Sequence, residues 1–97
     1  MYAVIFRAEI NRLDQSYSDM AARMRDLAKN TYGCIEFTSV TEGNQEIAIS
    51  YWRSEEQIIA WKQDPEHKLA QELGYSKWYK SYTVQVVKVE REYSNNR

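Results

Sequence analysis

The chain has 97 residues, of which 43% are apolar, and its 13 basic and 14 acidic side chains leave a formal net charge of -1. This length suits one domain, and the balanced charge excludes the strong basic field typical of nucleic-acid-binding proteins. No apolar run approaches the roughly 18 residues that a membrane span needs. The single cysteine, Cys34, forms no intrachain disulfide, so we expect one cytoplasmic domain over residues 1–97 without nucleic-acid or membrane partners.

The first half of the chain predicts a strand, a helix and a hairpin. Residues 2–10 are rich in apolar and β-branched side chains and predict a strand. A helix follows, with a capping-box start at Ser16 and Asp19 and an end near Tyr32, before Gly33. Its apolar stripe has helical spacing and consists of Leu13, Tyr17, Met20, Ala21, Met24, Leu27 and Ala28. Residues 34–42 and 45–53 predict two strands, joined by a Gly43-Asn44 turn of a primed type.

The second half predicts helices and one more strand. Ser54 and Gln57 form a capping box, and Asp64-Pro65 starts a second helical segment, which Gly74 ends. Residues 75–82 are aromatic-rich and fit either a short helix or a turn. Residues 82–92 predict the last strand, and residues 94–97 predict a loose tail.

The order of these elements predicts an α+β, ferredoxin-like βαββαβ fold, with an antiparallel four-stranded sheet and helices on one face. The last strand is apolar on both faces, with Val84 and Val86 on one side and Val87 and Val89 on the other. Because helices cover only one face, the second apolar face would stay in water in a monomer. The sequence therefore predicts a homodimer through sheet-to-sheet packing, a dimeric α+β barrel.

Three stretches resemble the antibiotic biosynthesis monooxygenase (ABM) domain family. They are YSDMAARMRDLAKNTYGC (17–34), SYWRSEEQIIAWKQDPEH (50–67) and SYTVQVVKVEREY (81–93). The resemblance covers nearly the whole chain and implies sheet-to-sheet dimers. It leaves activity open, because some members oxidise phenols or quinols with O2 and no cofactor, relatives degrade haem, and a fold alone does not set a function.

Trp61 and His67 are the candidate catalytic residues. The spacing of Trp61 alone favours a plain core position, whereas the resemblance places it in the wall of a pocket between helices and sheet. His67 is the only histidine, and it lies in the first turn of a helix, where the helix dipole keeps an imidazole neutral and able to accept a proton. A surface or capping histidine is the alternative.

An aromatic concentration around the second helical region predicts binding of a small planar compound. A flat apolar body with one polar tip suits a phenol or quinol, and dimer contacts or core packing are the alternative. The candidate substrate-binding residues are Tyr51, Trp52, Trp78, Tyr82 and Met24, with Tyr79 in the same group of aromatic side chains.

Several classes of site lack support in the sequence. The three glycines, at positions 33, 43 and 74, form no phosphate-binding loop, and one His with one Cys makes a poor zinc site, so we expect no cofactor and no metal. In the haem-degrading branch an axial His follows the helical Trp by ten residues, and an Asn lies on the first strand. Here Gln71 occupies the first position and residues 2–10 contain no Asn, which disfavours haem degradation.

Two hypotheses on function follow. The first is a cofactor-independent monooxygenase that oxidises a small phenolic or quinol compound with O2, with His67 as base or hydrogen-bond partner. The second is a non-catalytic module that uses the same pocket to bind a small aromatic ligand. A cavity with converging polar groups favours a site, whereas a cavity closed by Met20, Met24 and Trp61 favours plain core packing.

Overall fold

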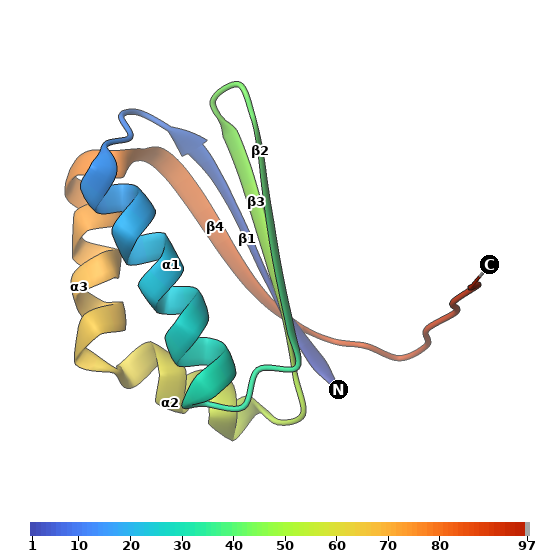
Figure 1. The fold of residues 1–97 in the computed structure, drawn as a ribbon. Helices are drawn as coiled ribbons and strands as arrows, with labels where there is room; N and C mark the ends of the chain where they lie inside the picture. Colours follow the sequence, from blue (N-terminus) through green and yellow to red (C-terminus); the bar gives the residue numbers. More distant parts are fainter. Residues whose placement is uncertain (97) are drawn as a thin grey trace.

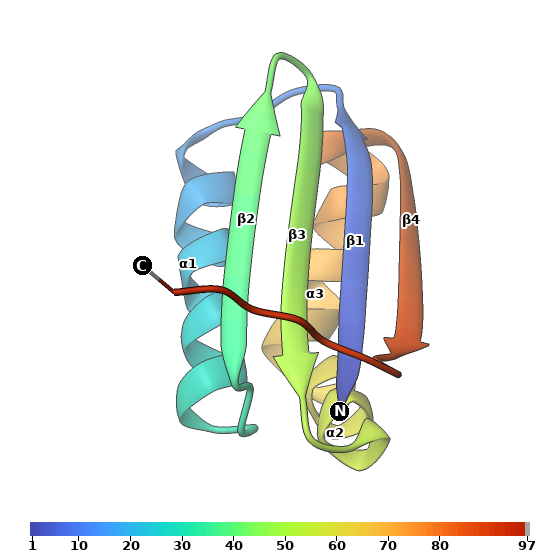
Figure 2. The ribbon, with the colours of Figure 1, turned by 90° about the vertical axis from the view of Figure 1, so that its right-hand side faces the viewer.

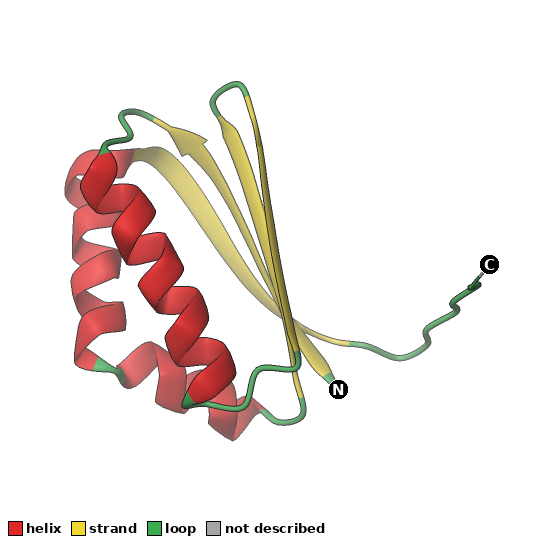
Figure 3. Ribbon diagram, in the orientation of Figure 1, coloured by secondary structure: helices red, strands yellow, loops and turns green. Residues whose placement is uncertain are grey.

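One antiparallel sheet of four strands forms the first layer of the fold in the computed structural model, which describes residues 1–96 (Figures 1 and 3). The strands lie in the order β2-β3-β1-β4. Their bounds are β1 Tyr2–Ile10, β2 Glu36–Glu42, β3 Gln45–Trp52 and β4 Tyr79–Lys88. The central strand β1 thus lies between β3 and β4, which are both distant from it in sequence. This is the ferredoxin-like βαββαβ arrangement that the sequence predicts.

Helices form the second layer and cover one face of the sheet (Figure 1). They are α1 Gln15–Asn30, α2 Glu55–Gln63 and α3 Pro65–Leu73, followed by one π-helical turn, η1 Gly74–Trp78. In Figure 2, α1 lies behind β2 and α3 behind β1, whereas β4 stands at the edge of the helical layer. None of the helices within residues 1–96 is long and apolar enough to cross a membrane.

Strand register decides which side chains meet the helices. Val4 pairs with Ser50 of β3 and Val86 of β4, so alternate residues from these positions point into the space between the layers. The core there includes Val4, Met24, Leu27, Ala28, Cys34, Trp52, Ile58 and Trp61. Burying these side chains supplies the main free energy that holds the helices on the sheet.

The other face of the sheet carries no helix (Figure 2). Apolar side chains remain in water on it: Val40 is 60% exposed, Ile47 40% and Val87 37%. Residues 89–96 form neither helix nor strand, and they extend away from the sheet on this bare side (Figures 1 and 2). The predicted loose tail, 94–97, thus lies within this segment except for residue 97, which is outside the described residues.

The start of α1 differs from the predicted capping box. Asp14, not Ser16, is the N-cap: its Oδ1 accepts from the Tyr17 backbone N–H at 3.0 Å and from the Ser16 hydroxyl at 2.6 Å. An ion pair with Lys77, at 2.7 Å, also holds Asp14. A carboxylate that accepts several donors caps more strongly than a serine, so the helix starts one residue before Ser16. It ends at Asn30, close to the predicted end, and Gly33 follows with φ 82°.

The predicted turn and the later caps are confirmed. Gly43 has a positive φ of 60° at the tip of the β2–β3 hairpin, while Asn44 does not share this sign, which fits a type II′ turn. The Ser54 hydroxyl accepts from the Gln57 N–H at 3.4 Å. The Gln57 side chain in turn accepts from the Arg53 N–H, one residue before the expected partner.

The predicted end of α3 at Gly74 is confirmed, because Gly74 is the C-cap of this helix, but the last strand is shifted. Gly74 keeps a right-handed φ of -60° and continues into η1. β4 then starts at Tyr79, which pairs with Ile10, and it ends at Lys88, opposite Tyr2. The strand therefore covers 79–88 rather than 82–92, and one further backbone hydrogen bond, from the Val89 N–H to the Met1 carbonyl at 2.9 Å, lies beyond its end.

Candidate functional site

A cavity of about 180 Å3 lies between the helices and the sheet. Its walls come from α1, α2, α3, η1 and the sheet, with Met20, Phe6 and Ala48 among the apolar side chains that line it. Tyr82 and Val84 of β4 also line it and remain about 40% exposed, because no helix covers β4. The cavity therefore opens toward solvent along this strand.

The structure brings five of the seven predicted site residues to this cavity. Trp61, His67, Met24, Trp78 and Tyr82 all line it. Tyr51 does not, because it pairs with Ala3 and its side chain lies on the bare face of the sheet. Trp52 does not either: it is 0% exposed beneath Trp61, and its indole N–H donates to the Ser50 hydroxyl at 2.8 Å. The substrate-binding role predicted for Tyr51 and Trp52 therefore lacks geometric support at this cavity.

Trp61 and His67 form one end of the cavity. The indole of Trp61 is 6% exposed, and the His67 ring meets it edge to face with 4.4 Å between ring centroids. Trp61 also packs on Trp52 at 5.2 Å and on Phe37 at 6.1 Å. Trp61 is thus both a core residue and part of the cavity wall, so the structure agrees with both alternatives that the sequence left open, the core position and the pocket wall.

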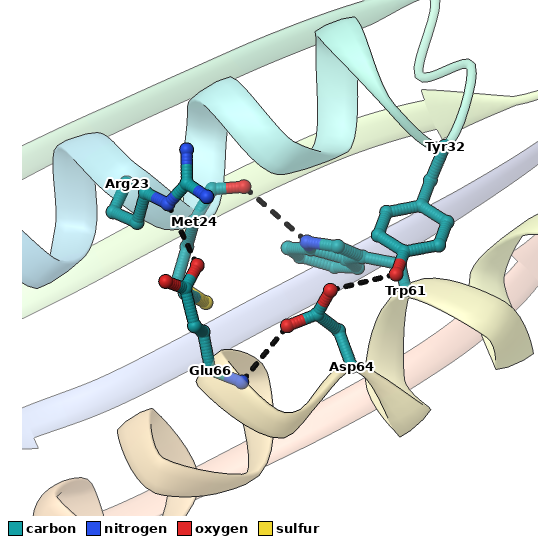
Figure 4. A network of polar contacts seen from close by, with 6 residues as sticks. All are labelled: Arg23, Met24, Tyr32, Trp61, Asp64 and Glu66. Carbon is teal, nitrogen blue, oxygen red and sulfur yellow. Dashed lines mark hydrogen bonds and ion pairs between the residues drawn. The ribbon is translucent and has the colours of Figure 1, made fainter.

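Hydrogen bonds between α1 and the α2–α3 junction fix this end (Figure 4). The Trp61 indole N–H donates to the Met24 carbonyl at 3.3 Å, and the Tyr32 hydroxyl donates to Asp64 Oδ2 at 2.6 Å. Asp64 Oδ1 accepts from the Glu66 N–H at 2.8 Å and so caps α3. Because His67 lies in the first turn of α3, this cap also sets where the imidazole stands.

Burial makes His67 a neutral hydrogen-bond acceptor and a weak base. Desolvation, and then the nearby Lys62 charge, lower the pKa of His67 from 6.5 to about 4. Its Nδ1 atom is buried and has no hydrogen-bond partner within the described residues. A phenol has a pKa near 10, so moving its proton to this imidazole costs about 8 kcal/mol. His67 is thus better suited to orient a ligand than to deprotonate it.

The depressed pKa of His67 predicts a loss of stability in acid. An unfolded histidine takes up a proton near pH 6.5, whereas the folded one does so only near pH 4. Stability from this group is therefore complete above pH 6.5 and falls as the pH drops to about 4, by on the order of 2–3 kcal/mol. We expect His67→Gln to lack this decrease in urea unfolding measured across the interval. Equal pH profiles for both proteins would contradict a buried neutral His67.

A carboxylate and a phenol form the polar group at another part of the cavity. Glu46 of β3 is only 7% exposed, and its Oε2 accepts from the Tyr79 hydroxyl at 3.1 Å. Burial raises the pKa of Glu46, and the Tyr79 hydrogen bond offsets part of this rise. Burial and the adjacent Glu46 charge raise the pKa of Tyr79, which therefore stays a donor. Both side chains line the cavity.

Sequence reasoning missed Glu46 as a site residue. It follows the hairpin directly, where a charged residue looks like the polar start of a strand. The signal available in the sequence is the alternation of side chains between the two faces of a strand. By this alternation Glu46 shares a face with Ala48, Ser50 and Trp52, and Trp52 is buried. A carboxylate on the same strand face as a buried tryptophan is the informative exception to burial rules.

No metal-binding cluster of three or more His, Cys, Asp or Glu side chains occurs within residues 1–96. The polar groups at the cavity are separate: His67 is at the Trp61 end, and Glu46 is paired with Tyr79. The arrangement can bind a small aromatic molecule between apolar walls and hydrogen-bond its polar substituents.

Comparisons with known proteins agree with this fold. The sequence model of the family described as "Antibiotic biosynthesis monooxygenase" matches residues 1–73. The chain is 41% identical over 92 residues to "Uncharacterized protein YqjZ" of Bacillus subtilis (strain 168), covering 94% of this chain and 81% of that protein. It is also 29% identical over 101 residues to "Jasmonate monooxygenase ABM" of Pyricularia oryzae, covering 99% of this chain but only 46% of that longer protein.

Solved structures share the architecture at low sequence identity. SnoaB from Streptomyces nogalater, described as a cofactor-independent oxygenase, superposes with a TM-score of 0.78 at 11% identity, covering 94% of each chain. This likeness supports the fold alone, while the family match spans three quarters of the residues. The chain therefore belongs to the antibiotic biosynthesis monooxygenase family.

Proposed function

We propose that this protein is a cofactor-independent monooxygenase that oxidises a small phenolic compound with O2. The observation that carries the proposal is the cavity, whose largely apolar and aromatic walls include, among their polar side chains, His67 and the Glu46–Tyr79 pair. Family membership and the oxygenase names of two similar proteins support it. A quinol remains within the same proposal, because a quinol and one O2 balance to a hydroxyquinone and one water, with the new oxygen on a ring carbon that carries hydrogen.

The size of the cavity limits the substrate. A cavity of about 150 Å3 in another protein holds one benzene molecule, and this one measures about 180 Å3. Drug-sized ligands need about 300–1,000 Å3. The substrate class proposed here is therefore a single-ring phenol or quinol.

The reaction needs no electron source besides the substrate. A phenol with a free para carbon and one O2 balance to a para-quinone and one water, and the phenol gives up all four electrons. The ring loses its hydroxyl proton as the first electron passes to O2, because a deprotonated ring transfers an electron to O2 more readily than the neutral phenol does. One oxygen atom then bonds to the para carbon, the O–O bond breaks, and the para C–H bond gives up its hydrogen as a proton. The other oxygen atom leaves as water with this proton and the hydroxyl proton.

The protein contributes orientation, proton acceptance and exclusion of water. Trp61 would form the flat wall against which the ring lies. The neutral His67 would accept a hydrogen bond from a polar group on the ring. Met24, Trp78 and Tyr82 would complete the apolar wall around it.

Oxygen consumption tests the proposed reaction. We expect metal-free protein to accelerate O2 uptake with at least one member of a panel of single-ring phenols and quinols. Ala21 lines the cavity and the next residue, Ala22, is exposed on the same helix. Ala21→Phe should therefore fill the cavity and abolish the acceleration, whereas Ala22→Phe should retain it. No uptake above the buffer rate across the panel would contradict the proposal.

We also propose that the protein is a homodimer through the bare face of its sheet. Val40, Ile47 and Val87 expose apolar surface there, and a second copy of the same face buries them symmetrically. The segment 89–96 extends away from the sheet on this side, where it can lie along the second copy (Figure 1). The dimer would have the sheet-to-sheet form of an α+β barrel.

A further inference from the structure

Glu46 stands out among the titratable groups of the cavity. It is 7% exposed, whereas Arg25 and Lys62, which also line the cavity, are half-buried. The two ion pairs within residues 1–96 are Arg23–Glu66 and Lys77–Asp14, so Glu46 has no cationic partner in the described part of the chain. A buried carboxylate without a cation is costly, and such a group in a cavity is a candidate functional residue.

The surroundings of Glu46 hold it in one place. Its strand position pairs with Ala8 of β1 and Thr41 of β2, so the side chain rises from a central strand, next to the β2–β3 hairpin, toward the helices. The Tyr79 hydroxyl occupies Oε2, and no hydrogen bond from residues 1–96 reaches Oε1. One carboxylate oxygen is thus fixed, and the other is available to a ligand.

Packing around Tyr79 makes this arrangement specific. The Tyr79 ring contacts Phe6 with 5.3 Å between centroids and Tyr17 with 6.0 Å. It also lies so close to Gly74 that a Cβ there would stand 3.0 Å from its Cδ2 and Cε2 atoms. The absence of a side chain at Gly74 therefore lets the ring settle where its hydroxyl meets Glu46.

We propose that the Glu46 carboxylate, held by Tyr79, recognises the hydroxyl of a neutral phenol in this cavity and accepts its proton during oxidation. The inference rests on the proposed function for its second step only. In the resting complex, the phenol O–H donates to Glu46 Oε1. During the reaction the O–H bond breaks, the proton passes to the carboxylate, and the electron passes to O2. Glu46 then gives the proton to the oxygen atom that leaves as water.

This role differs from that of His67. Burial favours the uncharged form of both side chains, which strengthens Glu46 as a base and weakens His67. The carboxylate also repels a phenolate, so the cavity should take up the neutral phenol. A phenolate would instead be drawn toward Arg25 or Lys62.

Ligand binding tests the recognition step without any turnover. The probes are 4-nitrophenol and its methyl ether 4-nitroanisole, which lacks the O–H, and the readout is quenching of tryptophan fluorescence. We expect the wild type to bind the phenol about tenfold more tightly or better, since hydrogen bonds to charged groups are strong. Glu46→Gln should bring the two affinities close together, and Glu46→Asp should keep part of the preference. Glu42→Gln, at an exposed site on β2, should match the wild type.

The colour of bound nitrophenol gives a second measurement that needs no variant. Its phenolate is yellow and its neutral form is colourless, so binding to wild-type protein at neutral pH should bleach the solution. Retained yellow colour on binding, or an undiminished preference for the phenol in Glu46→Gln, would overturn the inference.

Turnover separates this inference from the proposed function. We expect Glu46→Gln to lower O2 uptake about a hundredfold or more, the range of general-base catalysis. Unchanged uptake in this variant would refute the role of Glu46 in catalysis while the monooxygenase proposal stands. A Glu46-dependent preference for phenol without any O2 uptake would leave the recognition step in place and refute the oxidation.

Discussion

Trp61→Ala is expected to lower the free energy of unfolding by about 3–5 kcal/mol, as large-to-small changes of buried tryptophan do. The indole is 6% exposed and packs against three rings, those of Trp52, Phe37 and His67. It also donates to the Met24 carbonyl, which ties α2 to α1. Small domains have only about 5–15 kcal/mol of stability, so this loss is a large fraction of the total.

Trp61→Phe is the matched control, because it keeps an aromatic ring and removes the N–H. We expect a smaller loss, since most of the packing remains and one hydrogen bond of about 1 kcal/mol goes. Urea unfolding at neutral pH measures both values. A loss below about 1 kcal/mol for Trp61→Ala would mean that the helices hold to the sheet without this side chain.

The sequence predicts the fold well because each local signal agrees with the global arrangement. The helical stripe that includes Met24 and Leu27, the caps at Ser54 and Asp64 and the turn at Gly43 all appear in the structure where the sequence places them. The predicted start of α1 is wrong because Lys77, far along the chain, forms an ion pair with Asp14 and strengthens that cap. The predicted end of β4 is wrong because the length of a strand depends on the neighbouring strand. The local alternation of apolar and polar side chains does not reveal this neighbour.

The candidate site was harder to predict, since it depends on which strand face meets the helices. Tyr51 and Trp52 are adjacent and were both expected at the cavity, yet register sends Tyr51 to the bare face. Trp52 points inward but is wholly covered by the core. Glu46 was overlooked for the same reason: its partner Tyr79 is 33 residues away, and only the folded chain brings the two together.

Val87→Asp is expected to convert the proposed dimer into monomers. Val87 is 37% exposed on the bare face of β4, where a facing sheet would cover it. A carboxylate buried there without a partner costs several kcal/mol, about a hundredfold or more in the dissociation constant. Ile47→Asp, on the central strand β3 of the same face, should act in the same way, because the two side chains would lie in one interface.

The same strand offers a matched control. Val84 is 40% exposed, close to the value for Val87, but it lies on the helix-facing side and lines the cavity. Val84→Asp should therefore leave the dimer intact, even where it disturbs ligand binding. Sedimentation equilibrium at micromolar concentration distinguishes the two variants, and circular dichroism checks that each is folded. An interface of this kind buries more than about 1,000 Å2, so the wild type should be dimeric throughout this range. A folded wild-type monomer would show that the apolar side chains of the bare face tolerate water, and the barrel would have to be abandoned.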